Sequence, residues 1–237
     1  MVQNDMDTES RTYPLALTNL ARVRCVVVGG GAVAERKVRD LLAGGAQPRV
    51  ISPKLTDALA VWRESGRIEH LARSYRAGDL DGAFLAIAAT DDRAVNATIA
   101  AEAARLGILS NIADDPATGN FHTVATVRRG DLLLSVSTGG DSPALTARIR
   151  RELEARYGDE YARLLQLLRA LRDGPAHDLP PERRVRLWRR LASEVMLAWL
   201  RDGEDTRAEN YAREQLALLA DEDDEETRRH GDMERAV

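Results

Sequence analysis

Residues 25–37 read CVVVGGGAVAERK, and this stretch decides the fold. It opens with CVVVG, an unbroken apolar run typical of a strand that is buried on both faces of a sheet. Gly29, Gly31 and Ala34 follow with the G-x-G-x-x-A spacing of dinucleotide-binding turns. In such turns the first glycine permits a tight bend, the second lets the backbone approach a pyrophosphate, and the small third residue lets a helix pack on the strand. A strand-to-helix turn without a ligand is the alternative interpretation.

The rest of the first half alternates between strand and helix patterns. We expect helices over residues 33–43, 55–68 and 91–106, and strands over residues 48–53, 68–75 and 83–90. Thr90 or Asp91 is the expected N-cap of the third helix, and Gly107 is its expected C-cap. Strands that alternate with helices predict the α/β class, here a Rossmann-like parallel sheet.

The pattern changes in the second half. Two strands within NFHTVATVRRGDLLLSVST join at Arg129-Gly130-Asp131 without a helix between them. Ser142 and Pro143 then have the residue types of an N-cap and a first helical position, and the sequence beyond them is helical. We therefore expect four segments. They are a sheet domain (1–113), a small strand-rich module (114–142), a helical domain (143–220) and a disordered acidic tail (221–237).

Composition excludes several classes of function. The net charge is −4 with 30% charged residues, so no global basic field favours nucleic acid. The single cysteine, Cys25, rules out an internal disulfide and is expected in the core. The histidines have no ligand spacing, so we expect no resident metal site. No apolar window reaches the length of a membrane span, and the N-terminal residues lack a signal pattern, so we expect a cytoplasmic protein without a membrane partner.

The residues expected to bind the cofactor follow the predicted strands. They are Gly29, Gly31, Ala32, Val33, Ser52, Pro53, Thr90 and Asp91. The acidic residue that usually binds the NAD ribose is missing, because the second strand is followed by Ser52 and Lys54, so NADP stays open beside NAD. For Thr90 and Asp91, simple helix capping is the alternative role.

Three further motifs, read with the glycine turn, give the chain a family resemblance. They are AATDDRAVN (88–96), SNIADDPATGNF (110–121) and RRGDLLLSVSTGGDSPALTARIRRELE (128–154). In this order and spacing the chain, from about Tyr13 to Gly158, resembles the precorrin-2 dehydrogenase family of siroheme biosynthesis. The resemblance implies that NAD accepts a hydride from precorrin-2, which becomes sirohydrochlorin. Some members also insert ferrous iron, and the sequence leaves that choice open.

The resemblance also implies site residues. Asp114 matches the aspartate of the family's N-x-x-D pattern, whose asparagine is Asn111 here, and a dehydrogenation needs such a base. Its neighbour Asp115 precedes a proline and is expected to start a turn. Ser137, Thr138, Gly139 and Gly140 are expected beside the tetrapyrrole, with a capped helix start as the alternative.

Other features remain open. Arg148, Arg150 and Arg151 are candidates for substrate carboxylates, but a solvated helix face is expected for at least two of them. His122 stands where the family has an apolar residue, and its alternatives are a second acid/base, a transient iron ligand and a structural role. The family's homodimers imply an interface within residues 121–137, and the 143–220 segment is expected to bind the tetrapyrrole. The competing interpretation is a non-catalytic NAD-sensing domain whose helical tail binds a partner.

Overall fold

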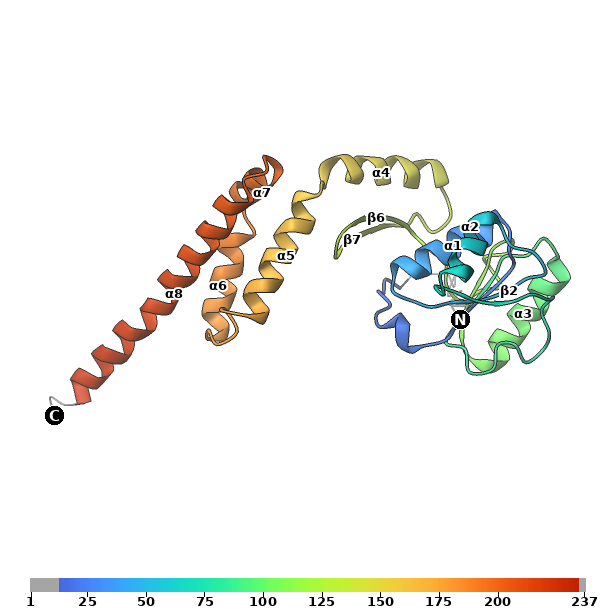
Figure 1. Cartoon of the computed structure of the whole chain (residues 1–237), viewed down its shortest axis with the longest axis horizontal. Helices are drawn as coiled ribbons and strands as arrows, with labels where there is room; N and C mark the ends of the chain where they lie inside the picture. Colours follow the sequence, from blue (N-terminus) through green and yellow to red (C-terminus); the bar gives the residue numbers. More distant parts are fainter. Residues whose placement is uncertain (1–12, 235–237) are drawn as a thin grey trace, which may run out of the picture. The chain divides into compact units, whose positions relative to one another are not determined.

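The computed structural model describes residues 13–234, with side chains for residues 13–220. The chain divides into two compact units, one ending at Thr123 and the other beginning at Val124. Figure 1 shows the elements of both units coloured along the sequence.

The first unit is built on a five-stranded parallel sheet of order β3-β2-β1-β4-β5. Its strands are β1 (Cys25–Val28), β2 (Arg49–Ile51), β3 (Glu69–Leu71), β4 (Leu85–Ala88) and β5 (Leu109–Ile112). Val27 of β1 lies opposite Val50 of β2 and Ile87 of β4, in the middle of the sheet. The expected α/β fold with a Rossmann-like parallel sheet is confirmed.

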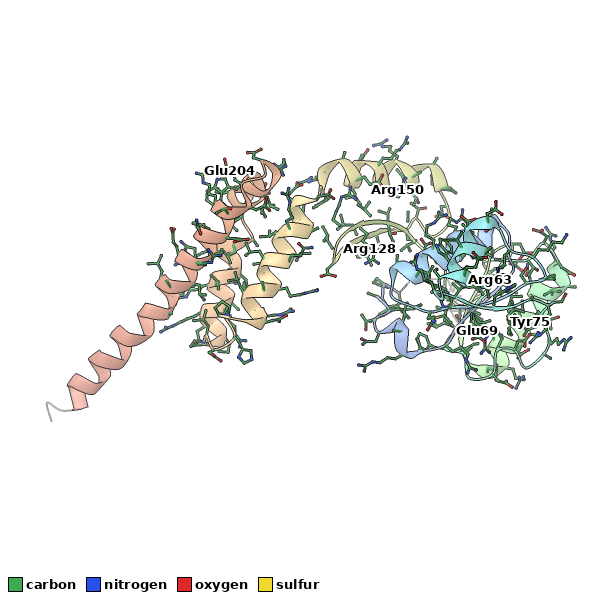
Figure 2. All side chains as sticks on the ribbon, in the orientation of Figure 1. Arg63, Glu69, Tyr75, Arg128, Arg150 and Glu204 are labelled. Carbon is green, nitrogen blue, oxygen red and sulfur yellow. The ribbon has the colours of Figure 1, made fainter. Side chains whose placement is uncertain are left out.

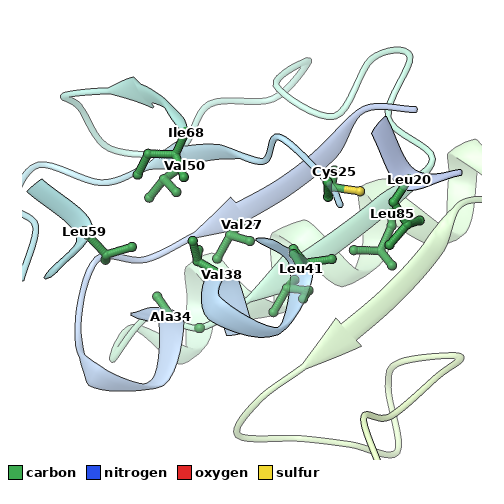
Figure 3. Close-up of a cluster of buried hydrophobic side chains, with 13 residues drawn as sticks. Leu20, Cys25, Val27, Ala34, Val38, Leu41, Val50, Leu59, Ile68 and Leu85 are labelled. Carbon is green, nitrogen blue, oxygen red and sulfur yellow. The ribbon is translucent and has the colours of Figure 1, made fainter. Parts of the chain in front are cut away.

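Helices cover both faces of this sheet (Figure 1). They are α1 (Ala32–Ala43), α2 (Asp57–Glu64) and α3 (Arg93–Leu106), and a short 3-10 turn, η1 (Leu20–Arg22), precedes β1. Alternate residues of β1 point to opposite faces, so Val27 packs under α1 and α2 whereas Val26 and Val28 pack under α3. Figure 3 shows the first of these cores, in which Val38 of α1 and Leu59 of α2 meet Val27.

Cys25 lies in the core, as the sequence predicted. Its side chain is fully buried in β1, and burial raises the pKa of the Cys25 thiol. A protonated, buried thiol is a packing residue.

The N-cap of α3 is Asp92, so both expected candidates, Thr90 and Asp91, are wrong. Asp92 caps the helix, because its Oδ1 accepts hydrogen bonds from the backbone N–H groups of Ala94 and Val95. The Thr90 hydroxyl lies before the helix start, where it donates to Asn96 Oδ1 at 2.7 Å and accepts from Asp92 N at 3.2 Å. Gly107 ends the helix with a φ of 66°, as predicted.

The boundary between the units falls later than the expected one after residue 113. Residues 114–123 return to β5 and complete the first unit. Asn120 Oδ1 accepts from the backbone N–H of Ser110 at 2.8 Å, and Phe121 packs against the core under α1. These contacts are between residues about ten apart, which strand and helix patterns do not encode.

The second unit begins with the expected hairpin of β6 (Ala125–Arg129) and β7 (Leu132–Val136), in which Val127 pairs with Leu134. Gly130 has a φ of 55° in the two-residue turn. Helix α4 (Pro143–Arg156) follows, and Ser142 Oγ accepts from Leu145 N as its N-cap.

Four further helices form the core of the second unit. They are α5 (Glu160–Asp173), α6 (Pro181–Leu191), α7 (Glu194–Arg201) and α8 (Asp205–Glu234). A cap at Ser193, whose Oγ accepts from Met196 N, begins α7 after α6 has ended. Helix α8 runs to Glu234, so residues 221–234 are helical where the sequence analysis expected disorder, and 235–237 lie outside the described residues. No proline interrupts the segment, so the helix that begins at Asp205 can continue through it, since each further residue adds one backbone hydrogen bond. Within the described part of the chain, no helix combines the length and apolar character that crossing a membrane requires.

Candidate active site

A cavity of about 1050 Å³ lies at the carboxyl edge of the sheet. Its walls come from the turns after β1, β2, β4 and β5. The chain leaves β1 toward β2 on one side, whereas β4 lies on the other side of β1, so the cavity stands where the strand order reverses. Open α/β sheets bind their ligands at such a point.

The glycine turn after β1 is closely packed against the turns that follow β2 and β4, and it is open on the side that faces the cavity. Gly29 has a φ of 122°, and a Cβ there would stand 2.2 Å from the carbonyl oxygen of Ala89. At Gly30 a Cβ would stand 1.9 Å from the carbonyl oxygen of Lys54. A Cβ at Gly31 would meet nothing within 4 Å, although Gly31 lines the cavity. The turn thus keeps its ligand side free.

The N-terminus of α1 offers backbone donors at this opening. Gly31 is its N-cap, and no side chain of the described residues caps the first turn. The first N–H groups of a helix and its dipole attract an anion, so Gly31, Ala32 and Val33 fit a pyrophosphate. Ala34 is fully buried and lets the helix approach β1. The residues present therefore fit a dinucleotide.

The turn after β2 contributes Ser52 and Pro53 to the cavity wall. The Ser52 hydroxyl donates to the carbonyl oxygen of Lys54 at 2.7 Å, which fixes the turn against Gly30. The hydroxyl proton of Ser52 therefore forms a hydrogen bond within the turn and is not directed to a ligand.

The turn after β4 is held by a buried asparagine of α3. Asn96 is 2% exposed, and its Nδ2 donates to the carbonyl oxygen of Thr90 at 3.0 Å and to Asp114 Oδ1 at 2.8 Å. Thr90 and Asp91 line the cavity, as does Asp114. One asparagine therefore connects the expected cofactor turn to the expected base.

Asp114 stands in the cavity wall just after β5, with its side chain 31% exposed. Its Oδ2 lies 4.0 Å from Nε of the largely exposed Arg93. Asp115 is absent from the cavity lining, and its carbonyl oxygen accepts from Thr118 in a turn. Asp114 therefore lines the cavity, whereas Asp115 belongs to a turn outside it.

Asn111 presents an unsatisfied acceptor. It lines the cavity at 4% exposure, and its Nδ2 donates to the carbonyl oxygen of Phe121 at 3.0 Å. Its Oδ1 is buried and has no hydrogen-bond partner among the described residues. Leaving a buried acceptor unpaired costs about 1–3 kcal/mol, so this oxygen stands out among the polar atoms of the site.

Sequence reasoning missed four residues of this site: Gly30, Lys37, Asn96 and Thr123. Gly30 was treated as a variable position of the motif, although its packing is the tightest of the turn. Lys37 falls on the inner face of α1 with Ala34 and Val38, and a lysine at such a position is a signal that the sequence offered. Asn96 and Thr123 act through contacts made only in the fold. His122 also lines the cavity.

The loop expected to bind substrate lies in the second unit, between β7 and α4. The Thr138 hydroxyl lies 3.0 Å from that of Thr146 and accepts from Ser142 N, so it secures the start of α4. Ser137 Oγ accepts from Gly139 N at 3.2 Å, and Gly139 and Gly140 both have positive φ. The first unit's cavity holds none of these residues.

Two of the three candidate arginines of α4 have partners within the helix. Arg148 pairs with Glu152 and Arg150 with Glu154, each four residues on, as on a solvated face. Figure 2 labels Arg150 on α4. Among the described residues no group of three or more His, Cys, Asp or Glu side chains is arranged to hold a metal ion.

The sheet order, the open glycine turn and the cavity define the first unit as a dinucleotide-binding domain. Residues 16–125 match a family described as "Putative NAD(P)-binding", and residues 129–156 match "Sirohaem biosynthesis protein central". The chain therefore belongs to the family formed by the NAD-binding region of siroheme synthases and by precorrin-2 dehydrogenases.

Individual relatives agree. The chain is 36% identical over 206 residues to a siroheme synthase of Chromobacterium violaceum, an alignment that covers 86% of this chain and 44% of the relative. It is 42% identical over 185 residues to that of Gluconacetobacter diazotrophicus, covering 75% of this chain and 39% of the relative. The chain thus spans less than half of these synthases.

A solved structure of similar length also matches. "SirC, precorrin-2 dehydrogenase" superposes with a TM-score of 0.71 at 27% identity, covering 87% of this chain and all of that one.

Proposed function

We propose that this protein catalyses the NAD-dependent dehydrogenation of precorrin-2 to sirohydrochlorin. The observation that carries the proposal is Asp114, a carboxylate fixed by Asn96 in the wall of the cavity that the glycine turn opens into. The relatives' names and the SirC likeness support the choice of substrate.

Different residues of the chain bind the cofactor, accept the proton and bind the substrate. Bound NAD supplies the hydride acceptor. The α1 N-terminus with Gly31, Ala32 and Val33 binds its pyrophosphate, while the turns at Ser52–Pro53 and Thr90–Asp91 flank it. As a C–H bond of precorrin-2 loses a hydride, Asp114 accepts the proton that the ring gives up, and the electron pair left by that proton extends the conjugated system. Asn111 Oδ1 accepts an N–H of the tetrapyrrole.

We also propose that residues of the second unit contact the substrate. Ser137, Thr138, Gly139 and Gly140 contact the tetrapyrrole, and helices within residues 143–220 bind it. We propose 1–113 as the cofactor domain and 114–142 as the module for the active site and for dimerisation, a functional division in which residues 114–123 pack with the first unit. Ferrous iron is a second substrate candidate, because Asp114 is also suited to take protons from pyrrole nitrogens before a metal enters.

We further propose a homodimer that forms through residues 121–137. The β6–β7 hairpin has two strand edges, and Leu133 of β7 is 41% exposed, which supports an interface there. Light scattering with Leu133→Asp, compared with the wild type, tests this assignment. We place the reaction in the cytoplasm, where the NAD pool is found.

Anaerobic incubation of the protein with precorrin-2 and NAD tests the activity. We expect equal amounts of sirohydrochlorin and NADH, a lower rate with NADP, and siroheme above the uncatalysed rate once ferrous iron is added. NAD binding without turnover would support the sensor interpretation and contradict the proposal.

A further inference from the structure

Lys37 is a buried cation in the cavity wall. It is 8% exposed and lies on α1 beside Ala34 and Val38, which pack on the sheet. Burial, with the neighbouring Arg36 charge, lowers the pKa of Lys37. Removing an ammonium from water costs several kcal/mol unless an anion and hydrogen bonds compensate for it.

The partners of Lys37 in the fold do not supply that compensation. Its Nζ donates to Thr123 Oγ1 at 2.7 Å, and a hydroxyl is neutral. Asp40, one helical turn on, opposes the lowering of the Lys37 pKa through its charge, but among the described residues no carboxylate forms an ion pair with Lys37. An ammonium has three N–H donors, so two remain for a ligand.

Helix geometry places Lys37 on the β5 side of the cavity. Successive helical residues are about 100° apart, so Lys37 and Arg39 point to different sides of α1. Arg39 faces Trp62 of α2, at 5.9 Å, on the side of β2 where a dinucleotide places its adenosine half. Lys37 instead meets Thr123, which closely follows the Phe121 segment bonded to β5. The nicotinamide half, and with it the substrate, belongs on this side.

The direction of the side chain brings the charge toward the cavity. Long side chains on a helix lean toward its N-terminus, which here opens into the cavity. Arg36 lines the same wall and adds a second cation.

We propose that Lys37, positioned by Thr123, binds a carboxylate of the tetrapyrrole substrate on the β5 side of the cavity. This inference rests on the proposed function for its substrate, an octacarboxylate. The pyrophosphate of the cofactor has its own donors at the first turn of α1, so we assign Lys37 to the carboxylate.

Three variants test the inference. Lys37→Met keeps the length of the side chain and removes its charge, and Lys37→Arg keeps the charge. Arg39→Met removes a cation from the other side of the same helix and serves as the matched control. For each we would measure KM and kcat with precorrin-2, Kd for NAD, and Kd for uroporphyrin III from its fluorescence anisotropy, after thermal melting has shown that the variant is folded.

We expect Lys37→Met to raise KM for precorrin-2 and Kd for uroporphyrin III about 10- to 100-fold, as for a lost charge-assisted hydrogen bond. The Kd for NAD should not change in Lys37→Met, Lys37→Arg should recover most of the porphyrin affinity, and Arg39→Met should match the wild type in porphyrin affinity.

Two results would overturn the inference: a weaker Kd for NAD with unchanged porphyrin affinity, which would assign Lys37 to a phosphate, or no change in either affinity. Failure of the wild type to bind uroporphyrin III would also reject it. If the wild type binds the porphyrin and does not oxidise precorrin-2, the proposed function fails, whereas the binding data still decide the role of Lys37.

Discussion

The Asn96 amide donates a 2.8 Å hydrogen bond to the Asp114 carboxylate and, through the same nitrogen, bonds the carbonyl oxygen of Thr90. Asn96 lies in α3, Thr90 follows β4, and Asp114 follows β5. One buried side chain therefore fixes the proposed base relative to the turn that flanks the cofactor.

Replacement of the base should remove the chemistry and leave cofactor binding intact. We expect Asp114→Asn to lower kcat about 100- to 10,000-fold, the usual contribution of a general base. The Kd for NAD, measured by calorimetry, should stay at the wild-type value. Asp115→Asn, in the exposed turn, is the control and should retain activity. Equal losses in both variants would refute the assignment to Asp114.

Asn96 should act through Asp114, as a positioning residue. We expect Asn96→Ala to lower kcat about 10- to 100-fold, because the carboxylate loses its orientation. In the Asp114→Asn background the same change should add almost nothing, since the group that Asn96 positions is already gone. The nearby variant Thr98→Ala on exposed α3 surface should leave kcat unchanged. Additive losses in the double variant would mean that Asn96 acts on something else.

Alanine substitutions at two adjacent glycines should have different effects, one on the stability of the fold and the other on the affinity for NAD. Gly30→Ala forces a Cβ against the Lys54 carbonyl oxygen, so we expect it to lower the free energy of unfolding by about 3 kcal/mol. Gly31→Ala meets open space, and its stability should stay within about 1 kcal/mol of the wild type. Its methyl group faces the pyrophosphate site, however, and should raise Kd for NAD at least about 10-fold. Urea denaturation and calorimetry measure both effects. Unchanged NAD affinity in Gly31→Ala would place the pyrophosphate elsewhere.

The Arg73–Asp79 pair should make part of the stability pH-dependent. Two hydrogen bonds from Arg73, each 2.7 Å long, and one from Arg76 N lower the pKa of Asp79 below its ordinary value of 3.8, although burial opposes them. A carboxyl with a depressed folded pKa stabilises the fold above its unfolded pKa and loses this contribution as the pH falls through the folded value.

Asp79→Asn should therefore cost about 1–2 kcal/mol at pH 7. The difference from the wild type should shrink below the ordinary pKa of 3.8, as urea denaturation at several pH values would show. Tyr75, labelled in Figure 2, lies in the same loop and lines the cavity, and it donates to Glu102 at 2.5 Å. Loss of the Arg73–Asp79 pair should loosen this loop, so the variant should also weaken NAD binding. A difference that is independent of pH would contradict the role of the Asp79 charge.

The sequence by itself determined the order and type of most elements of the first unit. Apolar runs such as CVVV, the glycine turn and Gly107 are local signals, because burial of a strand and positive φ at a helix end depend on residues next to one another. The hairpin at Gly130 and the Ser142 cap of α4 followed in the same way. The Asp114 assignment needed the family resemblance.

The tertiary structure alone decided which side chains meet. Asn96 reaches Asp114 across 18 positions of sequence, and Lys37 reaches Thr123 across 86. Parallel strands bring their carboxyl ends to one edge through long crossovers, so residues of the turns after them become neighbours without any local pattern. Water would solvate the charge of Lys37 and the side-chain oxygen of Asn111 in the unfolded chain. Only the fold buries these groups, and their burial is what makes them candidates for ligand contacts.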